Sequence, residues 1–314
     1  MTLDRGAFIA ATAGALVAQS QQTVRVLTVP TDAAKQILYA QQADLFGKNG
    51  LKCELSAMGS GAAMFAAVLG GSADIAAGSL FPVFSAYGHG IGLRIIAPIA
   101  IYDTDRCDTW LIVRKDSAIR APRDLNGKII GSDTANDVSV ASTRVWLDRH
   151  GGDGKSLRSV ELKTAEQLQA IDQGRIDTAS IKPPWLTLAM QSGRFRVLGK
   201  PLDAIAPRFL LSCWVATADY IAKNPAAVKG FVAAVTEGGR YANTHPAETV
   251  DMVAKFAGQD PALLRQGVRS VIATEIALAD IQKPLDFAYT YGVIDKQYDA
   301  RVMLSPFVPM TKTG

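Results

Sequence analysis

The side chains that most often perform catalysis are scattered in this sequence. Its three histidines, His89, His150 and His245, lie far apart. There is neither a His-Glu-x-x-His pair, which would bind zinc from one helix face, nor a Gly-x-Ser-x-Gly turn, which would expose a nucleophilic serine. The segment "GSGAAM" from Gly59 lacks the third glycine of a dinucleotide-binding turn. We therefore expect no catalysed reaction, no cofactor and no metal.

The cysteines give a similar result. Cys53, Cys107 and Cys213 have spacings that fit no zinc or redox motif. We expect them to be small buried thiols, with a Cys107–Cys213 disulfide as the alternative. No cysteine follows the N-terminal leader closely enough to be a lipidated first residue, which favours a protein that is free of a lipid anchor.

A different chemistry is indicated by polar and aromatic residues that follow short apolar segments at the expected starts of helices. Such residues cap the free N–H groups of a helix, and those N–H groups also attract anions. We expect them to contact a ligand, because ligands of open α/β sheets bind where parallel strands end. The candidate ligand-binding residues are Thr31, Asp32, Ser60, Gly61, Ser79, Asn136, Asp137, Lys182 and Trp185.

Three kinds of candidate have two interpretations each. Asp32 and Asp137 either cap their helices or face an amine or ring nitrogen of the ligand, since a carboxylate opposes an anion at a helix start. Trp185 follows two prolines and either packs in the core or stacks on the ligand. Lys182 is the candidate cationic contact, although an exposed lysine is more often simply solvated.

The elements that must position these residues occur twice. Short apolar strands are expected at residues 24–29, 52–57 and 73–77, and again at 128–131, 159–162 and 177–181, with helices between them. The phrase "GGSADIAAG" at 70–78 returns as "QGRIDTASI" at 173–181. In both copies a glycine ends a helix and an aspartate enters a buried strand, so Asp74 and Asp177 are expected to be structural. Each β-α-β-α-β unit predicts a mostly parallel sheet covered by helices.

The chain is therefore predicted to form two α/β lobes. After an expected strand at 210–217, helical periodicity continues at 226–242, 247–256, 261–267 and 277–291. This tail is expected to pack on the first lobe, which would give two crossings, near 103–109 and 208–212. The predicted domains are lobe I, residues 21–106 plus 212–314, and lobe II, residues 107–211. Two crossings between lobes form a hinge.

The beginning of the chain differs from the rest. An apolar run at residues 7–18 is followed by Ala18-Gln19-Ser20, which predicts a cleaved signal peptide at 1–20 and export to the periplasm. A leader on a cytosolic protein is the alternative, and the export route, general or twin-arginine, is open. The 314 residues are 48% hydrophobic and carry a net charge of +4 without a basic run, so the chain is a soluble globular protein and nucleic acid is excluded as a partner.

Five segments resemble a known family, the type II periplasmic solute-binding proteins of sulfonate, taurine and nitrate ABC importers. They are "ADLFGKNGLKCEL", "GSGAAMFAAVLGGSADIAAGS", "KDSAIRAPRDLNGKIIGS", "AIDQGRIDTASIKPPW" and "ADYIAKNPAAVKGFVAAV". The resemblance implies the two-lobed periplasmic-binding-protein fold with its ligand in the cleft. It also implies an inner-membrane ABC permease with its ATPase as partner, and we expect a monomer.

The resemblance leaves the solute open. A sulfonate or aminosulfonate such as taurine is the favoured interpretation, with the sulfonate on helix N-termini and an amine on Asp32 or Asp137. A heteroaromatic such as a thiamine-precursor pyrimidine is the alternative solute. In a different class, pyrimidine synthases of thiamine biosynthesis resemble the same fold, but they use a cysteine-rich motif with a nearby His and Lys, and this chain has no cysteine cluster.

Overall fold

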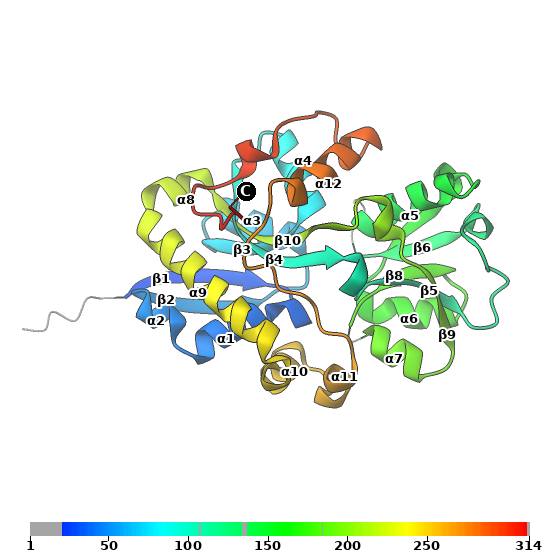
Figure 1. Cartoon of the computed structure of the whole chain (residues 1–314), viewed down its shortest axis with the longest axis horizontal. Coiled ribbons are helices and arrows are strands. Elements are labelled where there is room, and N and C mark those ends of the chain that lie inside the picture. The colour runs from blue at the N-terminus through cyan, green and yellow to red at the C-terminus, as the bar shows by residue number, and fades with distance from the viewer. Residues whose placement is uncertain (1–20, 107, 134–136, 184, 313–314) are drawn as a thin grey trace, which may run out of the picture.

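The chain folds into two lobes that lie side by side, each built on a five-stranded sheet (Figure 1). The computed structural model describes residues 21–106, 108–133, 137–183 and 185–312. Within these ranges no helix is both long and apolar enough to cross a membrane. The expected signal peptide at 1–20 lies outside the described residues.

The first sheet has the strand order β2-β1-β3-β10-β4. Strand β1 runs parallel to β2 and β3, whereas β10 is antiparallel to both β3 and β4, so four of the five strands point the same way. The strands are β1 (Gln22–Thr28), β2 (Leu51–Ala57), β3 (Ile75–Ser79), β4 (Leu93–Asp103) and β10 (Arg208–Thr217).

The second sheet repeats this plan with the order β7-β6-β8-β5-β9. Here β6 is parallel to β7 and β8, and β5 is antiparallel to β8 and β9. In each sheet the antiparallel strand is therefore the one that arrives from the other lobe. The strands are β5 (Trp110–Arg114), β6 (Ile129–Ser132), β7 (Arg158–Glu161), β8 (Thr178–Ile181) and β9 (Phe195–Gly199). The predicted two-lobed α/β fold is confirmed.

Helices cover both faces of each sheet, and the C-terminal helices return to the first lobe as expected (Figure 1). Lobe I carries α1 (Lys35–Gln42), α2 (Leu45–Lys48), α3 (Gly61–Leu69), α4 (Leu80–Gly88), α8 (Ala218–Lys223), α9 (Pro225–Thr244), α10 (Val250–Ala257), α11 (Pro261–Gln266) and α12 (Ala279–Thr290). Lobe II carries α5 (Val138–Arg149), α6 (Thr164–Asp172) and α7 (Trp185–Gln191).

The core of lobe I lies on both faces of its sheet. On one face Trp214 of β10, fully buried, packs edge-on against Phe231 of α9, and its indole N–H donates to Gln36 Oε1 at 2.8 Å. On the other face Phe81 and Phe84 of α4 pack together with α12. Burying these large side chains on both faces fixes the strands whose ends carry the candidate ligand-binding residues.

The chain crosses between the lobes at residues 104–109 and 200–207. The second crossing was expected near 208–212, but β10 already pairs with β4 at Arg208 and Asp103, so the predicted lobe boundary at 211/212 falls inside a strand of lobe I. The two crossings are joined to each other. Lys200 Nζ donates to Thr104 O at 2.9 Å, and the Tyr102 hydroxyl donates to Asp203 Oδ1 at 2.7 Å.

The repeated phrase has the same structural role in both lobes. Asp74 Oδ2 accepts the backbone N–H of Arg25 in β1 at 2.7 Å, and Asp177 Oδ2 accepts that of Ile129 in β6 at 2.8 Å. Each aspartate therefore ties the third strand of its β-α-β-α-β unit, β3 or β8, to the first strand of that unit, β1 or β6. The prediction that Asp74 and Asp177 are structural is confirmed.

Two of the three cysteines, Cys53 and Cys213, lie within the described residues. Cys213 is a buried free thiol, and burial raises its pKa, while Cys53 is a partly buried free thiol. Burial also raises the pKa of Cys53, to about 12, so neither thiol is activated as a nucleophile. Cys107 lies outside the described residues.

The two aspartates should differ in their effect on stability. Asp74 also forms a bidentate pair with the Arg25 guanidinium and its side chain is 11% exposed, against 33% for Asp177. We expect Asp74→Ala to lower the free energy of unfolding by about 2 to 3 kcal/mol and Asp177→Ala by about 1 kcal/mol. Urea unfolding followed by circular dichroism measures both, and an equal or reversed effect contradicts this assignment.

Candidate functional site

Three candidate residues of lobe I follow the carboxyl ends of neighbouring parallel strands. Thr31 follows β1, Ser60 follows β2, and Ser79 ends β3. Each is the N-cap of the helix that begins after it, so helix N–H groups are directed toward the same edge of the sheet. Ser60 Oγ accepts the Ala63 N–H at 3.4 Å, whereas the hydroxyls of Thr31 and Ser79 form no capping bond. These two hydroxyls can serve a ligand.

Asp32 lies among these residues but has a different role from either expectation. It is the first residue of the 3-10 helix Asp32–Ala34, its exposed fraction is 1%, and it does not cap that helix. Its Oδ1 accepts from Arg269 Nε at 2.7 Å. Its Oδ2 accepts the Ser270 N–H at 2.8 Å and faces Lys35 Nζ at 3.3 Å. Both carboxylate oxygens are thus bound within the protein, by two cations and an amide.

The electrostatics of this cluster are balanced. Burial alone would raise the pKa of Asp32, but Lys35 and Arg269, with the Ser270 amide, outweigh it and hold the pKa below its ordinary value. Burial lowers the pKa of Lys35 against the opposing attraction of Asp32. Lys35 also donates to Ser270 O at 2.6 Å. The Asp32 carboxylate therefore holds the C-terminal segment around Arg269 to lobe I.

Lobe II places its candidates at the matching edge of its own sheet. Asp137 follows β6 as the N-cap of α5, and its Oδ1 accepts the Ser139 N–H at 2.7 Å, so the capping interpretation is confirmed for this residue. Lys182 follows β8 and is exposed, and Trp185 begins α7 and is partly buried against the lobe II core. Asn136 lies outside the described residues.

Asp137 is an unusual carboxyl group. Burial raises its pKa above the ordinary value, the bonds from Ser139 oppose that rise, and Asp133 adds to it. The positive charge of Lys182 lowers the pKa of the same carboxyl, but less than burial raises it. A carboxyl in this environment can accept a hydrogen bond from an ammonium or, when protonated, donate one to an anion.

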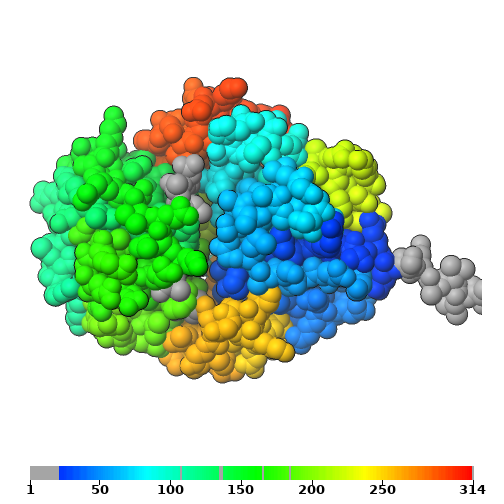
Figure 2. Space-filling view, turned by 180° about the vertical axis from the view of Figure 1, so that it is seen from behind, coloured from blue at the N-terminus to red at the C-terminus, as the bar shows by residue number. Residues whose placement is uncertain are grey.

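A narrow groove is visible where the surfaces of the two lobes meet (Figure 2). Strands β1, β2 and β3 of lobe I are followed by hydroxyls and helix N-termini, and strands β6 and β8 of lobe II are followed by a carboxyl, an ammonium and an indole. Among the residues that the structure describes, no group of three or more His, Cys, Asp or Glu side chains could hold a metal. The arrangement can bind a small polar molecule between the lobes.

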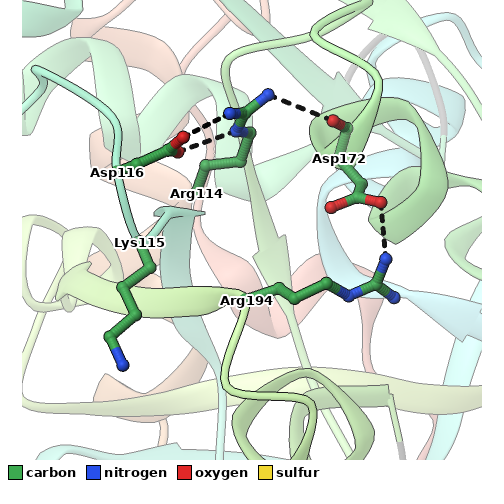
Figure 3. A pocket seen from close by; sticks show the side chains of 5 residues that line it. All are labelled: Arg114, Lys115, Asp116, Asp172 and Arg194. Atoms are coloured by element: carbon green, nitrogen blue, oxygen red, sulfur yellow. Dashed lines mark hydrogen bonds and ion pairs between the residues drawn. The ribbon is translucent and has the colours of Figure 1, made fainter.

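A second hollow lies away from this groove. It has a volume of about 470 Å³ and is bordered by charged residues at the opposite edge of the lobe II sheet (Figure 3). Arg114 binds both oxygens of Asp116, and Arg194 Nη1 lies 2.5 Å from Asp172 Oδ2, so these charges neutralise one another. Lys115 points away from the pairs (Figure 3). We therefore place the candidate site in the groove.

Sequence reasoning missed the residues that surround Asp32. Arg269 and Ser270 are 237 and 238 positions away from it in the chain. The segment between α11 and α12 that contains them has no regular secondary structure, so no periodicity marks them. Asp108, whose Oδ2 accepts from Ser270 Oγ at 2.9 Å, was considered only as part of a crossing. No local signal predicts these contacts.

Comparison with known proteins gives the family of the chain. The family model described as NMT1/THI5 like matches residues 33–249. The chain belongs to the NMT1/THI5-like family. A protein of Brucella abortus named as a binding protein is 26% identical over 231 residues, which are 72% of this chain and 68% of that protein.

Solved structures show the same fold at low identity. The periplasmic aliphatic sulphonate binding protein SsuA from Escherichia coli superimposes with a TM-score of 0.73 at 19% identity, covering 93% of this chain and 95% of that one. The periplasmic nitrate-binding protein NrtA from Synechocystis PCC 6803 gives a TM-score of 0.75 at 12% identity, covering 91% and 86%. The architecture of this family member is therefore that of periplasmic binding proteins.

The buried cluster leads to a prediction about Asp32. Asp32→Asn leaves Lys35 and Arg269 buried beside a neutral group, so the free energy of unfolding should fall by about 3 to 5 kcal/mol. The control is Asp219→Asn, which removes an exposed pair with Lys223 and should change it by less than about 1 kcal/mol. Chemical denaturation at neutral pH compares the two variants. Equal stability of Asp32→Asn and the unmodified protein would show that the cluster is not structural.

Asp137 should make stability depend on pH in the opposite sense from a paired carboxylate. Because its pKa is raised in the folded chain, its contribution is fully present below the unfolded pKa, about 3.9, and is lost as pH rises through the folded pKa. Asp137→Asn retains an oxygen for Ser139 but does not titrate. Its stability relative to the unmodified protein should therefore increase from about pH 4 toward neutrality, as measured by melting curves at successive pH values. A constant difference contradicts the raised pKa.

Proposed function

We propose that this protein is the exported solute-binding component of an ABC importer, which closes its two lobes on a small organic sulfonate or aminosulfonate such as taurine. The observation that carries the proposal is that both sheets have the same strand plan, with polar N-cap residues after their parallel strands, and that a groove lies where the two lobes meet. Membership of the NMT1/THI5-like family and the fold shared with periplasmic binding proteins support it.

Binding is favoured over catalysis by the nature of the groove residues. Hydroxyls, helix N–H groups and an ammonium bind polar atoms, whereas His89, His150 and His245 are each the C-cap of a helix, and the two thiols described are not activated. A solute that contacts both lobes binds best when they are together, so binding shifts the chain toward the closed form. The residues that bind the solute therefore also cause the lobes to close.

The anionic group of the solute is assigned to the helix N-termini. A sulfonate carries three acceptor oxygens, and helix N–H groups and free hydroxyls are donors suited to them. Thr31 and Ser79 supply hydroxyls that cap no helix, and Lys182 supplies a positive charge. A sulphonate binding protein and a nitrate-binding protein are among the proteins that share the fold, which is consistent with an anionic group in the ligand.

The cationic half is assigned to Asp137 rather than Asp32. Both oxygens of Asp32 are already held by Arg269, Ser270 and Lys35, whereas the bonds described for Asp137 come from one neighbour, Ser139, and carry no positive charge. An ammonium beside Asp137 would lower its raised pKa and form a charge-assisted hydrogen bond. This favours an aminosulfonate over a plain alkanesulfonate. Trp185 would form an apolar wall beside the solute's carbon chain.

A heteroaromatic solute remains the second candidate. Trp185 is partly exposed at the start of α7 and could stack on a planar ring, and Asp137 could accept from a ring N–H or an exocyclic amine. An importer component would work in the periplasm and deliver the solute to a membrane permease with its ATPase. We expect it to work as a monomer.

The test is a binding screen with a matched pair of variants. We expect taurine and ethanesulfonate to raise the melting temperature of the purified protein, and calorimetry to give an affinity for taurine that Lys182→Gln weakens about tenfold. The control is Lys229→Gln, an exposed lysine on α9 of lobe I, which should leave the affinity unchanged. Binding of aminopyrimidines but not sulfonates would favour the second candidate. Binding of neither class would overturn both.

A further inference from the structure

We propose that the last residue of α11 and the residues after it form a latch between the lobes. The latch sets the affinity for the solute without touching the solute. The latch extends from Gln266 to Ser270 and contacts α7 of lobe II. It deepens the proposed function because it depends on lobe closure, but it does not depend on which solute is bound. In Figure 2 the chain around α10 and α11, coloured yellow to orange, lies at the lower end of the groove and borders both lobes.

The tip of the latch lies against α7. Gln191 Nε2 donates a hydrogen bond to Gln266 Oε1, which joins the end of α7 to the end of α11. Next to this bond Gly267 packs so closely on Thr187 that a Cβ added to the glycine would overlap the threonine hydroxyl. Thr187 and Gln191 are four residues apart and therefore lie on one face of α7. The contact thus joins lobe I to lobe II outside the two crossings.

The root of the latch is fixed to lobe I. Arg269 and Ser270 bind the buried Asp32 carboxylate, as described above, and the Arg269 guanidinium also donates to Pro246 O at 2.9 Å. Arg269 is 12% exposed at its side chain and Asp32 is 1% exposed, so water competes little with these bonds. A tip attached to such a root moves with lobe I as one body.

The latch is also joined to the hinge and to the groove. Ser270 Oγ donates to Asp108 Oδ2 in the first crossing at 2.9 Å. Asp32 is adjacent in sequence to Thr31, which is a candidate solute contact. The first residue of α7, Trp185, is another candidate solute contact. A change in the spacing of the lobes therefore changes the tip, the first crossing and the groove together.

This geometry has a consequence for affinity. A contact that forms when the lobes are together increases the population of that state before the solute arrives. The apparent affinity is the intrinsic affinity of the closed state reduced by the fraction of chains that occupy it. Gln191, Gln266, Gly267 and Thr187 are thus positioning residues for binding, because they act through closure.

Two substitutions at the contact between Gly267 and Thr187 test the latch. Gly267→Ala places a methyl group against Thr187, and its backbone, φ −89° and ψ 160°, is one that alanine adopts readily. We expect this variant to open the lobes, so small-angle scattering of the solute-free protein should show a larger radius of gyration. Adding Thr187→Ala removes the overlapping hydroxyl and should restore the original radius. The control Gly92→Ala adds a methyl group in open space and should change nothing.

The affinity for taurine should change in the same variants as the radius of gyration. Calorimetry should show about a two- to tenfold weakening for Gly267→Ala, the strength of one hydrogen bond and its packing, with recovery in the double variant. Melting temperatures of all variants separate closure from damage to the fold. The latch is overturned if Gly267→Ala leaves the solute-free radius unchanged, or if Thr187→Ala does not reverse its effect. The scattering result holds even if taurine does not bind, in which case the sulfonate proposal fails and the latch is judged separately.

Discussion

The buried carboxylate of Asp32 is the constraint on which the described arrangement depends most. Taking a charge out of water is costly unless it is paired and hydrogen-bonded, and Asp32 meets both conditions with Lys35, Arg269 and the Ser270 amide. The cost of burial explains why the pairing is so complete. Because its partners come from the start and the end of the chain, this cluster fixes how the C-terminal segment returns across lobe I.

That return gives the two-lobed plan its third connection. The two crossings lie next to each other, because Lys200 of one donates to Thr104 O of the other. The segment held by Asp32 continues to α11, which meets α7 at the Gln191–Gln266 bond. The groove is thus bordered by elements whose spacing is set by charge pairing in lobe I and by packing at α7. We infer that lobe closure and solute binding both depend on this charge pairing and on this packing.

Most of the fold could be predicted from the sequence because its signals are local. Apolar runs, glycine stops and capping residues indicated three parallel strands in each half, although β4, β5 and β9 were not predicted. The repeated phrase correctly identified Asp74 and Asp177 as structural. The cap at Asp137 is also a local feature, which its bond to Ser139 confirms. The start of β10 at Arg208 was missed because its limit is set by pairing with Asp103, a contact between distant residues.

The candidate site was less predictable for the same reason. A sequence pattern places Thr31, Ser60 and Ser79 at strand ends, but it does not show which polar groups are already bound inside the protein. Asp32 looked like a cap or a ligand contact, and its true partners, Arg269 and Ser270, are more than two hundred residues away. Long-range pairing of this kind depends on the completed fold, so a single sequence does not contain a local sign of it.

If a sulfonate binds in the groove between the lobes, its position there can be measured directly. A crystal grown with 2-bromoethanesulfonate would locate the bromine by anomalous diffraction. We expect one strong signal in the groove, with the sulfonate oxygens near the helix starts that follow β1, β2 and β3 and with Lys182 and Asp137 on the facing side. A signal confined to the outer surface, for example beside Arg114 and Arg194, or none in the groove, would contradict it.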